Sequence, residues 1–416
     1  MKLYSFSQRY LAVMIAATVV CVFLCAFSAM SADWPQWRGP NRDGISSETG
    51  WSYTWPADGP KQLWNRSLGI GYATVSVSGD RAYTVGNKDK IDTVYCLDVN
   101  TGEDIWKYSY PCATESGGHK GPASTPTVDG KNVYTLSREG HLFCFDADSG
   151  KVIWGKHLEQ DFGAKHPEWD FACSVLVLDN MVIVDAGMAI AVDKSTGELV
   201  WKTKDYGVSW DIKNQGGGYS SPYAFQLNGS QRLSVFNSSG LVILDPKSGQ
   251  ELMLHPWKTS YNINAATPIV SGDKLFISSG YKVGAALLQI SGDKPVVIWQ
   301  NKEMRNQFSS CVLWEGHLYG FDDKKLKCME WETGNVKWTQ SGLGMGSLML
   351  ADGKMIIMSD KGKLVIAEIS PDSYKELASA KVLSGLCWTV PVLANGRIYC
   401  RNHDGELLCL DVKGSN

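Results

Sequence analysis

The sequence carries little net charge and few motifs that mark a specialised class of protein. Its 40 basic and 43 acidic residues leave a net charge of -3, with no basic stripe and no acidic tail. Outside the first 32 residues it has no apolar run long enough to span a bilayer. It also lacks the Gly-x-Ser-x-Gly motif and the glycine spacing of P-loop and dinucleotide-binding proteins. These absences argue against nucleic-acid binding and leave no ready-made catalytic motif.

The first 32 residues have the character of a secretory signal peptide. Lys2 and Arg9 give a short basic start, residues 11–27 are almost wholly apolar, and small residues then lead up to Asp33. This order predicts cleavage just before Asp33, and a transmembrane anchor at the short end of a span is the alternative. We therefore expect the mature chain to be residues 33–416, periplasmic or secreted, with no membrane span of its own.

The residues in abundance are tryptophan, tyrosine and glycine, at 16, 17 and 42 copies. This composition is typical of a turn-rich β protein with recurring aromatic anchors. A repeated string explains it. The string reads CLDVNTGEDIW at 96–106, CFDADSGKVIW at 144–154 and AVDKSTGELVW at 191–201, and looser copies end at Met253 and Trp338. In each copy an aspartate can accept hydrogen bonds from the turn, a glycine supplies positive φ, and an aromatic residue can pack against the next repeat.

A second series of turns counts the repeats. Each unit has a two-residue turn between two earlier strands, and the turns are Gly79-Asp80, Asp129-Gly130, Asp179-Asn180, Asn228-Gly229, Gly272-Asp273, Glu315-Gly316, Asp352-Gly353 and Asn395-Gly396. These eight turns divide the 384 residues of 33–416 into units of about 48, which is the period of a propeller blade. The sequence therefore predicts an all-β protein with eight four-stranded blades.

The two ends of the repeat array complement each other. The last unit stops at CLDVKGSN, 409–416, and lacks a fourth strand. The early segment KQLWNRSLG at 61–69 has the missing strand's character, with Trp64 at the anchor position. We therefore expect the N-terminal strand to complete the last blade and remove the open edges of the ring.

Cysteine use also follows the repeat. Without the signal, nine of the 11 cysteines remain, so they cannot all pair internally. Four share one position of the repeat: Cys96, Cys144, Cys328 and Cys409. Because Ala191 and Ile243 take that position in other repeats, we expect a small buried apolar residue there rather than a disulfide or a metal ligand.

The Asp-x-x-(Ser/Thr)-Gly-x-x-x-Trp string resembles the pyrroloquinoline-quinone (PQQ) repeat. That repeat is found in quinoprotein alcohol dehydrogenases and in eight-bladed outer-membrane assembly lipoproteins. The segment DWPQWRGPNRDGIS at 33–46 is similar to the opening of exported PQQ-like propellers. The resemblance covers nearly all of 33–416 and implies the fold more firmly than the function. The chain has no adjacent cysteine pair of the kind that methanol and ethanol dehydrogenases place against their cofactor.

Three long connections are the expected place for a ligand, at about 108–123, 157–172 and 205–219. A PQQ site would need cations for the tricarboxylate, Ca²⁺ held by carboxylate and amide oxygens, a tryptophan face and an aspartate base. The candidates for these roles are Arg305 or Lys213, Asn214 or Asn264, Trp169, Trp210 or Trp388, and Asp170 or Asp211. The alternative is that these are solvated loop residues and aromatic plugs of the channel mouth.

We predict a monomeric, non-catalytic binding or scaffold protein that engages a protein partner or a small molecule over one channel face. The alternative is a PQQ- and Ca²⁺-dependent dehydrogenase of an alcohol or a sugar. The scattered histidines do not predict a metal site.

Overall fold

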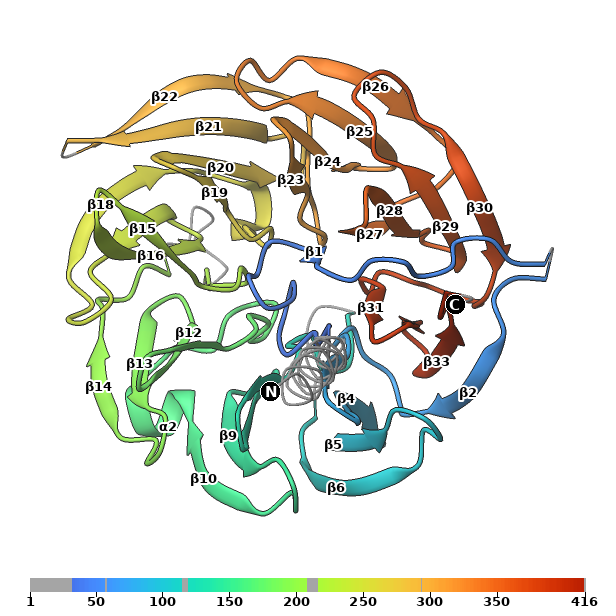
Figure 1. The fold of residues 1–416 in the computed structure, drawn as a ribbon. Coiled ribbons are helices and arrows are strands. Elements are labelled where there is room, and N and C mark those ends of the chain that lie inside the picture. The colour runs from blue at the N-terminus through green and yellow to red at the C-terminus, as the bar shows by residue number, and fades with distance from the viewer. Residues whose placement is uncertain (1–31, 57, 114–118, 208–215, 293, 415–416) are drawn as a thin grey trace, which may run out of the picture. The chain divides into compact units, whose positions relative to one another are not determined.

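The strands of the protein form eight sheets arranged in a ring (Figure 1). The computed structural model describes residues 32–416 except 57, 114–118, 208–215, 293 and 415–416. Each sheet has four antiparallel strands, and one of them gains β1 (Ile45–Ser46) as a fifth strand, parallel to β27. The structure therefore confirms the predicted eight-bladed propeller.

The first four blades follow one another along the chain. Blade 1 contains β3 (Ser76–Ser78), β4 (Arg81–Lys88), β5 (Ile91–Asp98) and β6 (Asp104–Pro111). Blade 2 contains β7 (Thr127–Asp129), β8 (Asn132–Leu136), β9 (His141–Asp146) and β10 (Val152–His157). Blade 3 contains β11 (Leu176–Leu178), β12 (Met181–Asp185), β13 (Ala189–Asp193) and β14 (Leu199–Lys202). Blade 4 contains β15 (Tyr223–Leu227), β16 (Ser230–Asn237), β17 (Gly240–Leu244) and β18 (Glu251–Pro256).

The remaining blades continue this order, with one exception in blade 8. Blade 5 contains β19 (Ile269–Ser271), β20 (Lys274–Ser279), β21 (Gly284–Ser291) and β22 (Lys294–Asn301). Blade 6 contains β23 (Val312–Trp314), β24 (His317–Asp322), β25 (Lys325–Glu330) and β26 (Val336–Gln340). Blade 7 contains β27 (Ser347–Ala351), β28 (Lys354–Met358), β29 (Lys363–Glu368) and β30 (Glu376–Lys381). Blade 8 contains β31 (Val392–Ala394), β32 (Arg397–Arg401), β33 (Glu406–Asp411) and the early strand β2 (Gln62–Ser67). Two short helical segments, α2 (Leu158–Phe162) and η1 (Ser260–Asn262), lie between blades.

Ring closure takes place in blade 8. β2 pairs antiparallel with β33, and Trp64 lies opposite Cys409 in the register. The N-terminal strand therefore completes the last blade, as the sequence predicted. No helix in the described part of the chain is long and apolar enough to cross a membrane.

The repeated tryptophan joins six of the eight blades, 1, 2, 3, 5, 6 and 8, to the next one. Its indole N–H donates to a carbonyl of the following blade, for example from Trp106 to the Ala147 oxygen at 2.9 Å. The same bond is made by Trp64, Trp154, Trp201, Trp299 and Trp338. The repeat glycine of the next blade lies under the ring, because a Cβ built on Gly150 would come within 2.5 Å of Trp106. This glycine therefore supplies both the positive φ of the turn, 69°, and the space for the indole.

The other repeat residues also act as predicted. The Asp98 carboxylate accepts hydrogen bonds from the amides of Asn100 and Thr101 at 2.8 and 2.9 Å. The nine cysteines that the structure describes are buried and free of disulfides. The shared cysteine position is thus an apolar core position.

The segment before β1 runs across the middle of the ring (blue in Figure 1). Two of its arginines are buried in the channel. Arg42 donates to the Val175 carbonyl of the blade 3 approach at 3.0 Å, and Arg38 donates to the Cys311 carbonyl of the blade 6 approach at 3.0 Å. Burial lowers the pKa of Arg42 to about 10. The segment therefore ties opposite sides of the ring together, and its Trp37 forms part of the cavity described next.

Candidate functional site

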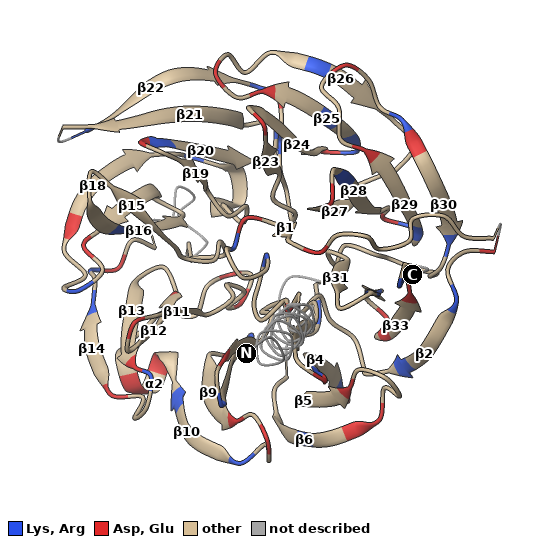
Figure 2. Ribbon diagram, in the orientation of Figure 1, with Lys and Arg blue, Asp and Glu red and all other residues tan. Residues whose placement is uncertain are grey.

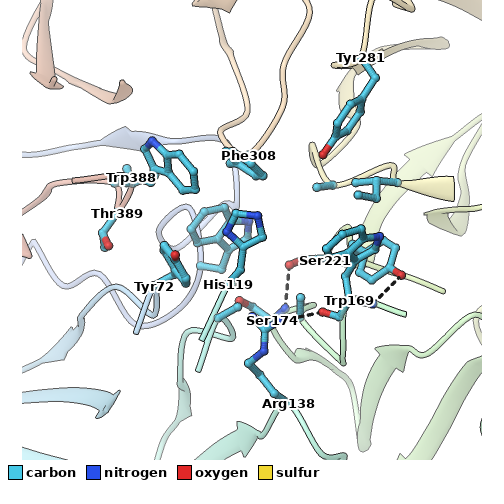
Figure 3. A pocket seen from close by; sticks show the side chains of 17 residues that line it. Tyr72, His119, Arg138, Trp169, Ser174, Ser221, Tyr281, Phe308, Trp388 and Thr389 are labelled. Atoms are coloured by element: carbon cyan, nitrogen blue, oxygen red, sulfur yellow. Dashed lines mark hydrogen bonds between the residues drawn. The ribbon is translucent and has the colours of Figure 1, made fainter. Parts of the chain in front are cut away.

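A cavity of about 190 Å³ lies where the approaches to the inner strands meet (Figure 3). Eight of its 17 lining residues have aromatic side chains: Trp37, Tyr72, His119, Trp169, Tyr219, Tyr281, Phe308 and Trp388. Trp37 comes from the N-terminal segment and Tyr281 from the hairpin between β20 and β21. The others come from connections between an outer strand and the next inner strand, including the three long ones.

The cavity is built from positions that are equivalent in every blade. The strand registers align each repeat anchor with one inner-strand residue; in blade 1, for example, Trp106 pairs with Cys96, Cys96 with Tyr83, and Tyr83 with Ser76. The corresponding inner residues of blades 1 to 8 are Ser76, Thr127, Leu176, Tyr223, Ile269, Val312, Met349 and Val392. The residues two and four positions before them in the chain form two sets of eight equivalent residues.

We call the set two residues before them the hydroxyl ring. It consists of Thr74, Thr125, Ser174, Ser221, Thr267, Ser310, Ser347 and, in blade 8, Val390. Within it, amides donate to hydroxyls of the next blade: Thr125 to Ser174, Ser174 to Ser221, and Thr267 to Ser310, each at 2.9 Å. The hydroxyl ring therefore ties neighbouring blades together along the channel.

We call the set four residues before them the rim. It consists of Tyr72, Ala123, Ala172, Tyr219, Ala265, Phe308, Met345 and Trp388. Blades 6, 7, 8 and 1 contribute large side chains in succession, whereas blades 2, 3 and 5 contribute alanine. Every rim residue except Met345 lines the cavity. The cavity therefore exists because the alanine side of the rim leaves room in front of an aromatic wall.

The aromatic wall is a continuous stack. The rings of Phe308 and Trp388 are stacked with centroids 4.4 Å apart, and Tyr72 stacks on His403 at 4.5 Å. His119 lies among these rings, 5.7 Å from Trp388 and 6.2 Å from Trp169. Burial and the nearby Arg138 charge lower the pKa of His119, so its imidazole is neutral at pH 7.

A chain of alternating charges supports the Trp169 side of the cavity. Arg138 Nε donates to Asp170 Oδ2 at 2.9 Å, and its Nη2 donates to the Trp169 carbonyl at 3.0 Å. His166 lies between two carboxylates, with Nε2 at 2.9 Å from Asp170 and Nδ1 at 2.5 Å from Glu159. The hydrogen bond to Asp170 raises the pKa of His166 above its ordinary value. Because each ring nitrogen faces an acceptor, the protonated imidazolium fits this position best.

The candidate residues from the sequence fall in three places. Trp169 and Trp388 line the cavity. The side chains of Asp170, Asn264 and Arg305 do not line it and are bonded to protein groups: Asp170 to Arg138, Asn264 to the Asn237 carbonyl at 2.7 Å, and Arg305 to Asp322. Trp210, Asp211, Lys213 and Asn214 lie outside the described residues.

The described lining does not match the needs of PQQ and Ca²⁺. It contains one arginine, whose Nε, Nη1 and Nη2 all donate to protein oxygens, and no carboxylate or side-chain amide. Among the described residues, no three His, Cys, Asp or Glu side chains are grouped so as to hold a metal ion. A tricarboxylate needs free cationic side chains, and a calcium ion needs carboxylate or amide oxygens. The described residues therefore do not fit the cofactor.

Sequence reasoning missed Tyr72, His119, Tyr219 and Phe308 as cavity residues. A usable signal was present, because each rim residue stands two positions before a Ser or Thr of the hydroxyl ring in seven of eight blades. Aligning the units on their inner turns, and allowing two extra residues in each strand of the blade 4 hairpin, would have shown the large and small halves of the rim.

A family model described as outer membrane protein assembly factor BamB matches residues 111–340, more than half of the chain. The chain belongs to this family. A tetrathionate hydrolase of Acidithiobacillus ferrooxidans is 23% identical over 255 residues, 58% of this chain and 46% of the relative. The BamB of Burkholderia pseudomallei is 28% identical over 149 residues, 33% of this chain and 35% of the relative. The chain thus spans less than half the length of either curated relative.

A solved structure of a quinohemoprotein alcohol dehydrogenase from Comamonas testosteroni superposes with a TM-score of 0.68. The identity is 15%, and the match covers 95% of this chain and 82% of the dehydrogenase. This likeness shows the fold. One of the relatives is named as an assembly factor. A dehydrogenase has a similar fold.

Proposed function

We propose that this protein is a non-catalytic binding protein that holds a protein partner over the cavity face of its channel. The observation that carries the proposal is the uneven rim, with five large side chains and three alanines at equivalent positions around one apolar recess (Figure 3). Protein interfaces are commonly anchored by one aromatic or apolar side chain that fills such a recess.

The size of the recess supports a side chain rather than a large cofactor as its occupant. Its volume is about 190 Å³, whereas drug-sized ligands occupy pockets of about 300–1,000 Å³. An apolar cavity of about 150 Å³ is already enough to bind benzene. The recess therefore suits a single ring or a branched apolar group, and the name of the family, an assembly factor, supports a protein as its source.

The charge distribution is consistent with this role. Lys and Arg are interspersed with Asp and Glu around the described blades (Figure 2), which does not favour nucleic acid as the partner. We also propose that the mature chain is a monomer in the periplasm or outside the cell, because a signal-like segment precedes it and the pairing of β2 with β33 leaves no blade incomplete.

The test uses 5-fluoroindole as a probe of one ring. In ¹⁹F NMR titrations of the full mature chain we expect saturable binding to one site. Ala172→Phe should abolish it, because the new ring fills the alanine side of the rim. Ala113→Phe makes the same change at an exposed position and should bind like the parent chain. Equal binding by all three proteins, or none by the parent, would overturn the proposal.

The alternative enzyme function has its own test. The chain is mixed with PQQ and Ca²⁺, and absorbance and dye reduction are followed over alcohols and sugars. Turnover that depends on PQQ would replace the binding-protein proposal with a dehydrogenase. Under our proposal there is neither a spectral change nor turnover.

A further inference from the structure

Two histidines face each other across neighbouring strands at the outer part of blade 2. His141 begins β9, His157 ends β10, and the register places them directly opposite one another. Residues opposed in this way bring their Cβ atoms within about 4.5–5.5 Å. Their imidazole centroids are 4.9 Å apart, with the rings nearly perpendicular at 81°. Both side chains are half-buried and line an open groove.

The distance between the rings agrees with two imidazoles on one metal ion. A metal–nitrogen bond is about 2.0–2.1 Å long, so each ring centre lies about 3.2 Å from the ion. Bond angles between 90° and the tetrahedral value then place the two ring centres about 4.5–5.2 Å apart. The observed 4.9 Å lies inside this range.

The hydrogen bonds leave the nitrogens needed for binding. His141 Nδ1 lies 3.1 Å from Ser137 Oγ, so its Nε2 remains for a metal and Nδ1–H can donate to the hydroxyl. A second hydrogen bond of this kind is the usual partner of a metal-bound histidine. His157 Nδ1 has no hydrogen-bond partner, and its backbone amide donates to Asp161 Oδ2 at 2.6 Å. Each imidazole therefore keeps a ring nitrogen that has no hydrogen-bond partner within the described residues.

The surroundings supply negative charge and room for water. His141 and His157 line an open groove together with the carboxylate residues Glu139 and Asp161. The neighbouring Lys156 is paired with Glu198 at 2.9 Å. Within the described residues no third His, Cys, Asp or Glu completes a metal-binding group, so water would fill the other coordination positions.

We propose that His141 and His157 form a two-histidine site for a borderline divalent metal ion, of which Cu²⁺ should bind most tightly. Imidazole nitrogen suits Cu²⁺, Ni²⁺ and Zn²⁺, and affinity along this series is highest for Cu²⁺. The site is separate from the aromatic cavity and does not depend on the proposed function.

The test titrates the mature chain, prepared without a polyhistidine tag, with CuCl₂, NiCl₂ or ZnCl₂ at pH 7.5. We expect one Cu²⁺ per chain, with an electron paramagnetic resonance spectrum showing coupling to two imidazole nitrogens. His157→Asn and His141→Asn should each weaken Cu²⁺ binding at least tenfold. The matched control is His317→Asn, which removes a half-buried histidine of blade 6 and should change nothing. Thermal melting of the metal-free variants establishes that they are folded.

The parent protein alone also tests the site, because the spectrum does not depend on any variant. A spectrum without imidazole coupling would overturn the proposal. Equal affinity of the parent and His157→Asn would do the same and would leave the ring pair as edge-to-face packing.

Discussion

Arg138 Nε donates to Asp170 Oδ2 at 2.9 Å, and the two side chains are only 4% and 5% exposed. The pair lies directly beside the cavity, because Arg138 also holds the Trp169 carbonyl. Asp170 has a φ of 60°, an unusual backbone conformation for a residue other than glycine. The ion pair therefore fixes both the local backbone and the position of one cavity wall.

Replacing Arg138 by methionine should lower stability strongly. The substitution removes the guanidinium that neutralises the buried Asp170 carboxylate, and breaking a buried pair in this way costs about 3–5 kcal/mol. Denaturant unfolding at pH 7 measures the change. The control is Arg81→Met, which breaks a partly exposed pair with Asp148 and a hydrogen bond to the Ala147 carbonyl and should cost only about 1 kcal/mol. Equal losses in the two variants would contradict this account of the pair.

The His166 position should make stability depend on pH. Its folded pKa is raised by the hydrogen bond to Asp170, so its contribution is complete below the ordinary pKa of about 6.5 and is lost as pH rises through the folded value. His166→Gln lacks this titration. The difference in unfolding free energy between parent and His166→Gln should therefore shrink from pH 5.5 to pH 8.5. A difference that stays constant or grows with pH would refute the charged form.

Asp185 should also make stability fall as pH rises, but over a lower pH range than His166. It is fully buried at the end of β12, its Oδ2 has no hydrogen-bond partner, and burial raises its pKa to about 7. Ionisation of the folded protein is therefore unfavourable, and stability should fall between about pH 4 and pH 7. Asp185→Asn removes the charge and keeps the oxygen that accepts from Gly187. We expect the unfolding free energy of the variant minus that of the parent to be larger at pH 8 than at pH 5, as measured by chemical denaturation.

The contact between Trp106 and Gly150 can be separated from backbone strain. Gly150→Ala and Gly130→Ala both place a Cβ at positive φ, 69° and 59°, which costs about 1–2 kcal/mol. The added methyl meets the Trp106 ring in the first case and open space in the second. Gly150→Ala should therefore be the more destabilising by thermal or denaturant unfolding. Equal effects would show that the indole adapts without loss.

The features that the sequence predicted are local ones. The Asp98 turn, the Gly150 turn and the eight inner turns each depend on a few neighbouring residues with a fixed backbone requirement. Closure by Trp64 was also predictable, because the incomplete last unit and the early strand share one repeat position. These signals do not need knowledge of distant contacts.

The cavity depends on contacts between distant residues, and the sequence predicted it only in part. Trp169 and Trp388 were found because the long connections and their aromatics stand out in the sequence. Asn264 and Arg305 look like binding residues in the sequence, yet their polar groups are bonded to Asn237 and Asp322. Whether a polar side chain faces a ligand or a neighbouring carbonyl is decided by packing between segments, which residue type alone does not encode.

The pairing of β2 with β33 also governs how the protein can fold. Trp64 and Cys409 are 345 positions apart in the chain, so this ladder has a very high contact order. Ladders between such distant strands form slowly, because the loop entropy must be lost before any pairing compensates it. The ring cannot close until residue 411 has been synthesised, and until then the last blade presents an open edge. A permuted chain in which β2 follows β33 directly would turn this closure into a local hairpin and should fold faster.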